Sequence, residues 1–77
     1  MRSVEQLLKR ITHDASKCGG RPCVRGLRIR VSDVLELLAA YKQREELLQD
    51  HPDLENEDLD ACLLYASRQL DHAVLSA

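Results

Sequence analysis

The stretch KCGGRPCVRGLRIRV, residues 17–31, concentrates the side chains of this sequence that could do chemistry. It holds two of the three cysteines, all three glycines and five cationic residues. Thiolates can bind a metal ion, a glycine-rich loop can bind phosphate, and glycine with proline can turn the chain. The spacing of these residues distinguishes between the three roles.

A metal site is the first possibility, and the spacing argues against it. A structural zinc site takes its ligands as two close pairs. Four residues separate Cys18 from Cys23, and the remaining possible ligands are scattered along the chain: His13, His51, Cys62 and His72. We therefore expect no metal, and cysteines that are small buried thiols. A disulfide between Cys18 and Cys23 is geometrically conceivable, but a reducing cytosol disfavours it.

Nucleotide binding and catalysis have less support. The segment CGGRP matches neither GxxxxGK[ST] nor GxGxxG, so we expect no nucleotide and no other cofactor. No spacing places a nucleophile beside a base, and four carboxylates are expected on a solvated helix start: Glu55, Glu57, Asp58 and Asp60. The sequence thus predicts a binding protein without catalytic residues or a small-molecule substrate.

The remaining role is to turn the chain. Gly19, Gly20 and Gly26 permit left-handed backbone angles, and Pro22 lacks an amide donor. We expect these four to be structural turn residues.

A small hairpin should follow this turn. From Leu27 to Val31 apolar residues alternate with arginines, which is the period of a half-buried strand. Before Gly26 the alternation is out of step, because the apolar residue there is the even-numbered Val24. A two-residue turn at Arg25–Gly26 that pairs Val24 with Leu27 accounts for this change. The arginines would then lie on the solvent face.

Four arginines are the candidate DNA contacts: Arg21, Arg25, Arg28 and Arg30. A two-stranded ribbon can enter the major groove, where arginine pairs well with guanine. The alternative is that these arginines bridge to the acidic helices of a partner subunit.

Charge divides the chain into two halves. Residues 1–31 carry eight cations and two anions, residues 32–77 carry three cations and eleven anions, and the net charge is −2. The basic half could contact phosphates or an acidic protein, and the acidic half could mask a basic surface such as the active-site rim of a nuclease. Alternatively, the halves attract each other within the chain or across a dimer.

Helical periodicity covers much of the rest. Residues 3–11 predict a short helix in which Ser3 and Gln6 have capping-box spacing. A strand through Ile11 and Thr12 is the alternative for its end.

Two further helical segments precede the only other proline. Ser32–Asp33 makes a good helix start, and a second piece covers about residues 43–49. Periodicity leaves open whether residues 33–50 form one helix or two.

A long helix should run from about Asn56 to Val74, after the stop at His51–Pro52. Its expected buried face comprises Leu59, Cys62, Leu63, Ala66, Leu70, Ala73 and Val74. Three apolar residues lie off this stripe and are predicted to contact a second copy or another partner: Leu64, Tyr65 and Leu75.

Length and composition indicate one small domain, residues 1–77, with a basic N-terminal helix and arm (1–31) and a helical core (32–77). The absence of Phe and Trp predicts an aliphatic core. A protein of this composition is poorly suited to stacking the bases of a single-stranded nucleic acid. Because the N-terminus does not resemble a signal peptide and no segment is long enough to span a membrane, we expect a protein of the cytoplasm. The helical periodicity predicts a mainly α fold.

Two segments in this order, CGGRPCVRGLRIRVSDVLELLA and EELLQDHPDLENEDLDACLLYA, resemble the domain-of-unknown-function 433 family over residues 18–66. The chain departs from the family pattern at four places: Leu27, Arg30, Ala40-Tyr41-Lys42 and Glu55. The resemblance implies a homeodomain-like three-helix domain of helix-turn-helix type behind a short β-hairpin arm, commonly a homodimer. It also implies an antitoxin of a type II toxin–antitoxin pair, which binds a PIN-like ribonuclease toxin and could also bind operator DNA.

Overall fold

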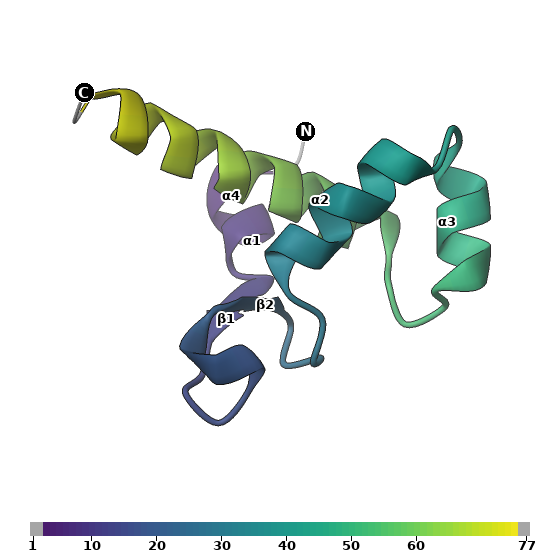
Figure 1. The fold of residues 1–77 in the computed structure, drawn as a ribbon, viewed down its shortest axis with the longest axis horizontal. Helices are drawn as coiled ribbons and strands as arrows, with labels where there is room; N and C mark the ends of the chain where they lie inside the picture. The colour runs from purple at the N-terminus through teal and green to yellow at the C-terminus, as the bar shows by residue number, and fades with distance from the viewer. Residues whose placement is uncertain (1–2, 76–77) are drawn as a thin grey trace.

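The computed structural model describes the backbone of residues 3–75 and the side chains up to residue 71. The described part is mostly helical, with four helices and one two-stranded antiparallel sheet. In chain order its elements are α1 (Val4–Leu8), β1 (Ile11–His13), the 3₁₀ turn η1 (Cys18–Gly20), β2 (Pro22–Val24), α2 (Val31–Ala40), α3 (Arg44–Asp50) and α4 (Asn56–Leu75). In Figure 1, α1 and α2 lie against α4, and the C-terminal half of α4 projects beyond the other elements.

The first helix is shorter than predicted. The hydroxyl of Ser3 accepts a hydrogen bond from the amide of Gln6 at 3.1 Å, which confirms the expected cap. However, α1 ends at Leu8, and Ile11 begins a strand instead of completing the helix. The strand alternative is therefore correct, because Ile11 is buried and pairs with Val24.

The sheet pairs differently from the prediction. β2 pairs with β1 in the register Ile11↔Val24, Thr12↔Cys23 and His13↔Pro22. The expected partner strand over residues 27–31 does not form. In its place there is an isolated bridge between Cys23 and Arg30 and a hydrogen bond from the Val24 amide to the Ile29 carbonyl at 3.0 Å, and the chain then enters α2 at Val31.

The predicted turn at Arg25–Gly26 is nevertheless present. The amide of Leu27 donates to the carbonyl of Val24 at 2.7 Å, and φ is 46° at Arg25 and 75° at Gly26. Two central residues with positive φ define a type I′ turn. Glycine fits this geometry without strain, whereas Arg25 adopts it at a cost.

The second helix begins at Val31, two residues earlier than expected, and its cap differs. The Asp33 carboxylate, not the Ser32 hydroxyl, accepts from the backbone amide of Arg30 at 3.3 Å. At the other end Tyr41 and Gln43 are extended, so α2 and α3 are two separate helices.

Aliphatic side chains form the core, as the composition predicted. The buried apolar residues are Ile11, Cys23, Val24, Val31, Val34, Leu47, Leu54, Leu59, Ala61 and Cys62. On α4 the burial of Leu59 and Cys62 is confirmed, but Leu63 and Leu70 are 43% and 66% exposed. The prediction that these two side chains are buried was wrong. The side chains of Ala73 and Val74, also predicted to be buried, lie outside the described residues.

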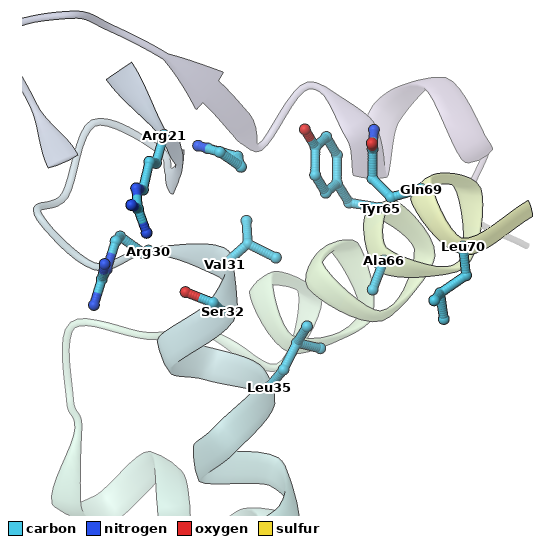
Figure 2. A pocket seen from close by; sticks show the side chains of 10 residues that line it. Arg21, Arg30, Val31, Ser32, Leu35, Tyr65, Ala66, Gln69 and Leu70 are labelled. Atoms are coloured by element: carbon cyan, nitrogen blue, oxygen red, sulfur yellow. The ribbon is translucent and has the colours of Figure 1, made fainter. Parts of the chain in front are cut away.

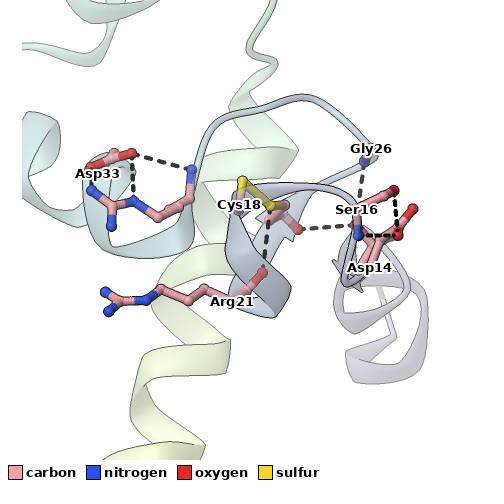
Figure 3. The surroundings of a disulfide bond; sticks show 9 residues. Asp14, Ser16, Cys18, Arg21, Gly26 and Asp33 are labelled. Carbon is pink, nitrogen blue, oxygen red and sulfur yellow. Dashed lines mark hydrogen bonds and ion pairs between the residues drawn. A yellow bond between two sulfur atoms is a disulfide. The ribbon is translucent and has the colours of Figure 1, made fainter.

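A disulfide joins Cys18 to Cys23, contrary to the expectation of free thiols (Figure 3). Positive φ angles at Cys18, Gly19 and Gly20 curl the chain back, so the two cysteine Cα atoms lie 6.6 Å apart. Cys62 is a free and buried thiol, and burial followed by the charge of Asp58 raises its pKa to about 12.

None of the helices in the described part of the chain is long and apolar enough to cross a membrane.

The three cysteines should differ in reactivity. We expect iodoacetamide to modify none of them in the folded protein without reductant, because the thiolate is the reactive species and Cys62 is buried. A mild reductant should make Cys18 reactive, while Cys23 and Cys62, which are both buried, should react only after unfolding. Intact-mass spectrometry checks this, and modification of Cys18 without reductant would contradict it.

Candidate functional site

One buried carboxylate lies at the centre of the polar contacts in this structure. The Asp58 side chain is fully buried, and Arg25 binds both of its oxygens, with Nε at 2.8 Å and Nη2 at 2.7 Å. Arg10 Nη1 donates to the same carboxylate at 2.9 Å, and the amide of Glu55 does so at 2.8 Å. Asp58 therefore also caps the start of α4 by reaching back to Glu55.

This cluster answers two questions that the sequence left open. Arg10 and Arg25 belong to the basic half, whereas Asp58 and Glu55 belong to the acidic half, so the two halves attract each other within one chain. The prediction that Asp58 lies on a solvated helix start is wrong, because its side chain is buried. The position of Asp58 three residues after Glu55 was the available signal, because an acid there can accept from the first free amide.

The protonation equilibria follow from these contacts. Burial by itself would raise the pKa of Asp58, but hydrogen bonds from Arg25, the Glu55 amide and Arg10 outweigh it and hold the pKa below its usual range. The pKa of Arg10 is raised by its hydrogen bonds to Glu55 and Asp58, and that of Arg25 by its hydrogen bond to Asp58. All three groups are therefore charged at neutral pH.

The four candidate DNA-binding arginines have different environments. Arg25 is engaged by Asp58, and Arg30 contacts Asp33 with Nη2–Oδ1 at 3.3 Å. Arg21 and Arg28 are exposed, and their side chains make no hydrogen bond or ion pair among the described residues. The structure does not gather all four on one surface.

Arg21 and Arg30 instead meet at one end of an apolar groove (Figure 2). The groove has a volume of about 430 Å³ and lies between the start of α2 and the middle of α4. Its apolar wall comprises Val31, Leu35, Ala66 and Leu70. We call this feature the α2/α4 groove.

The predicted interface residues of α4 have separate outcomes. Leu64 and Tyr65 are half-buried, and Tyr65 packs against the core while its hydroxyl lies 3.1 Å from Nε2 of His13. The side chain of Leu75 lies outside the described residues. The exposed apolar residues Leu63 and Leu70, which we had assigned to the core, are the better contact candidates.

Among the residues that the structure describes, no group of three or more His, Cys, Asp or Glu side chains is arranged to hold a metal ion.

Comparison with known proteins gives a family. The family model described as "Protein of unknown function (DUF433)" matches residues 11–66. This range includes both sequence segments on which the resemblance depended, and the elements from β1 into α4. No curated protein and no solved structure matches the chain.

Replacing Asp58 with Asn should destabilise the fold by roughly 3 kcal/mol, because a buried ion pair then loses one partner. The lowered pKa gives the sign of the pH effect: the stabilisation is present above the unfolded pKa of about 4 and is lost as pH falls through the folded pKa. The free energy of unfolding, measured in urea, should therefore fall at acid pH by more for the wild type than for Asp58→Asn.

The matched control is Asp60→Asn, because Asp60 pairs with Arg44 at 2.9 Å in a more exposed setting. We expect it to cost about 1 kcal/mol or less. Equal losses for the two variants would contradict the central role of Asp58.

Proposed function

We propose an antitoxin-like role for this chain, which belongs to the DUF433 family of proteins of unknown function. It would bind and neutralise a PIN-like ribonuclease toxin of a type II pair, with control of its own operon as a second role. The observation that carries the proposal is the family match, because it spans both segments by which the chain resembles antitoxin-like proteins. The protein would act in the cytoplasm, where such a toxin meets its RNA.

The charge distribution supports a nuclease as the partner. Ion pairing within the chain leaves other acids exposed, among them Glu45 and Glu46 in the first turn of α3. Neither makes a hydrogen bond or an ion pair among the described residues. A ribonuclease must attract a polyanion, so the rim of its active site is basic and complementary to this face of α3.

A homeodomain-like arrangement of α2, α3 and α4 is part of the same proposal. In such a domain the last helix would enter the major groove with its N-terminal residues leading. Here that end places the carboxylates of Glu55, Glu57 and Asp60 at least partly in solvent, where they would repel phosphates, whereas Asp58 is buried. The helical core is therefore better suited to a protein partner than to DNA.

The proposal predicts that a gene beside that of this protein encodes a PIN-like nuclease, and co-expression of the two products tests it. The wild-type protein should form a complex with this nuclease and restore growth of cells that it inhibits. Replacing Glu45 and Glu46 together with Gln should weaken the complex about tenfold, because the attraction to a basic rim is reduced.

The matched control is Glu5→Gln, another exposed acid of a different helix, which should bind like the wild type. Circular dichroism verifies that each variant is folded. The absence of any complex with the wild-type protein would overturn the antitoxin role, and equal binding by all variants would remove α3 from the interface.

DNA binding is the second candidate function, and the free guanidinium of Arg28 favours it. Of the four arginines that we assigned to DNA, Arg28 is exposed, lies outside the α2/α4 groove and has no partner among the described residues. It follows the type I′ turn in the loop between β2 and α2.

Binding to a duplex from the protein's own upstream region should weaken steeply with salt. Arg28→Ala should lower the affinity for all sequences and reduce the salt slope by about 1. Arg68→Ala, an exposed arginine on α4, is the control that should leave binding unchanged. Fluorescence anisotropy measures both, and equal behaviour of the two variants would exclude contact through the arm.

A further inference from the structure

The Cys18–Cys23 disulfide is unexpected in a chain that we place in the cytoplasm. Cytosolic reductants keep most thiols free, and the disulfides that do form there usually serve catalysis or redox sensing. The sequence predicts a binding protein without catalytic residues, so the disulfide of this chain is better suited to redox sensing.

The two cysteines differ in what holds them. Cys23 is 1% exposed, pairs with Thr12 in the sheet and forms a bridge with Arg30. Cys18 is half-buried and begins the 3₁₀ turn outside the sheet. A reductant can therefore reach the sulfur of Cys18, while the sheet keeps Cys23 in place after the bond is broken.

The segment of residues 14–20 depends on the disulfide for its position. Among the residues that the structure describes, the hydrogen bonds of this segment stay within residues 14–21, as do those between Asp14 and Ser16 (Figure 3). The disulfide links the segment to β2. Cys18 also has a φ of 53°, a left-handed conformation that a residue with a side chain rarely adopts. Breaking the disulfide removes this link and lets Cys18 return to an ordinary conformation.

The disulfide also determines where Arg21 lies. Arg21 is inside the ring that the disulfide closes, and its amide donates to the carbonyl of Cys18 at 3.1 Å. Its side chain lies at the cationic end of the α2/α4 groove and has no hydrogen bond or ion pair among the described residues (Figure 2). Because the backbone of the ring places this cation, relaxation of the ring removes it from the groove.

We propose that Cys18 and Cys23 form a redox switch, which holds residues 14–21 and the guanidinium of Arg21 in place when oxidised and releases them when reduced. The thiolate of a dithiol reductant attacks the sulfur of Cys18, the bond to Cys23 breaks, and the Cys23 thiolate takes up a proton. The second thiol of the reductant then attacks the mixed disulfide and releases Cys18 as a thiol. Two electrons and two protons pass to the chain, and the reductant becomes a disulfide.

Limited trypsin digestion of the purified protein tests the switch without a toxin or DNA. Trypsin can cleave after Lys17, which precedes Cys18, and after Lys42, which is exposed between α2 and α3. Dithiothreitol, a dithiol, should accelerate cleavage after Lys17 about tenfold, because a backbone must open locally to be cleaved. Cleavage after Lys42 should be unchanged, and it corrects for any effect of the reductant on trypsin. Mass spectrometry of the fragments 1–17 and 18–77 measures the rate.

The variant Cys18→Ser removes the disulfide without a reductant. It should be cleaved after Lys17 at the rate of the reduced wild type and should not respond to dithiothreitol. The matched control is Cys62→Ala, which keeps the disulfide and should respond like the wild type. Circular dichroism verifies that each variant is folded. Equal cleavage of the oxidised and reduced wild type would overturn the proposal, and so would acceleration after Lys42 as well, since that indicates general unfolding.

In the cell the switch rests on the cytoplasmic location that the proposed function requires. Protein trapped with a thiol reagent should be reduced in growing cells and oxidised after treatment with hydrogen peroxide, which takes two electrons from the thiols and becomes water. A cysteine pair that stays in one form under both conditions would overturn the switch, whether or not the protein binds a nuclease.

Discussion

The carboxylate of Asp58, buried between Arg25 and Arg10, holds three distant parts of the chain together. Arg10 follows the first helix, Arg25 occupies the type I′ turn, and Asp58 lies in the first turn of α4. A charge that is removed from water is tolerated only when it is paired and hydrogen-bonded, and Asp58 has three such donors. The position of the arm against the helical core depends on this contact.

The same contact decides which arginines are available for binding. Arg25 has positive φ and directs its guanidinium at Asp58, so it stabilises the fold instead of a ligand complex. The loop closed by the Cys18–Cys23 disulfide carries Arg21 to the end of the α2/α4 groove. Arg28 is left exposed in the loop between β2 and α2. A cluster that appears uniform in the sequence thus separates into structural and exposed members.

The exposed surfaces suit binding to macromolecules. One is the apolar α2/α4 groove with its cationic end, and the other is the acidic start of α3. They lie on different elements, so an occupant of the groove would leave the acidic start of α3 free.

The sequence by itself determined the helical segments after residue 31, the turn and the family. The period of apolar residues located the regions of α2, α3 and α4 but not the break between α2 and α3, and Arg25–Gly26 specified the two-residue turn, because these signals are local. Tertiary structure decided the rest. It selected β1 as the partner of β2, buried Asp58 and exposed Leu70, since each outcome depends on which distant segment comes to lie beside the residue. Pairing between segments far apart in the chain leaves no periodic trace, so it could not be predicted from spacing.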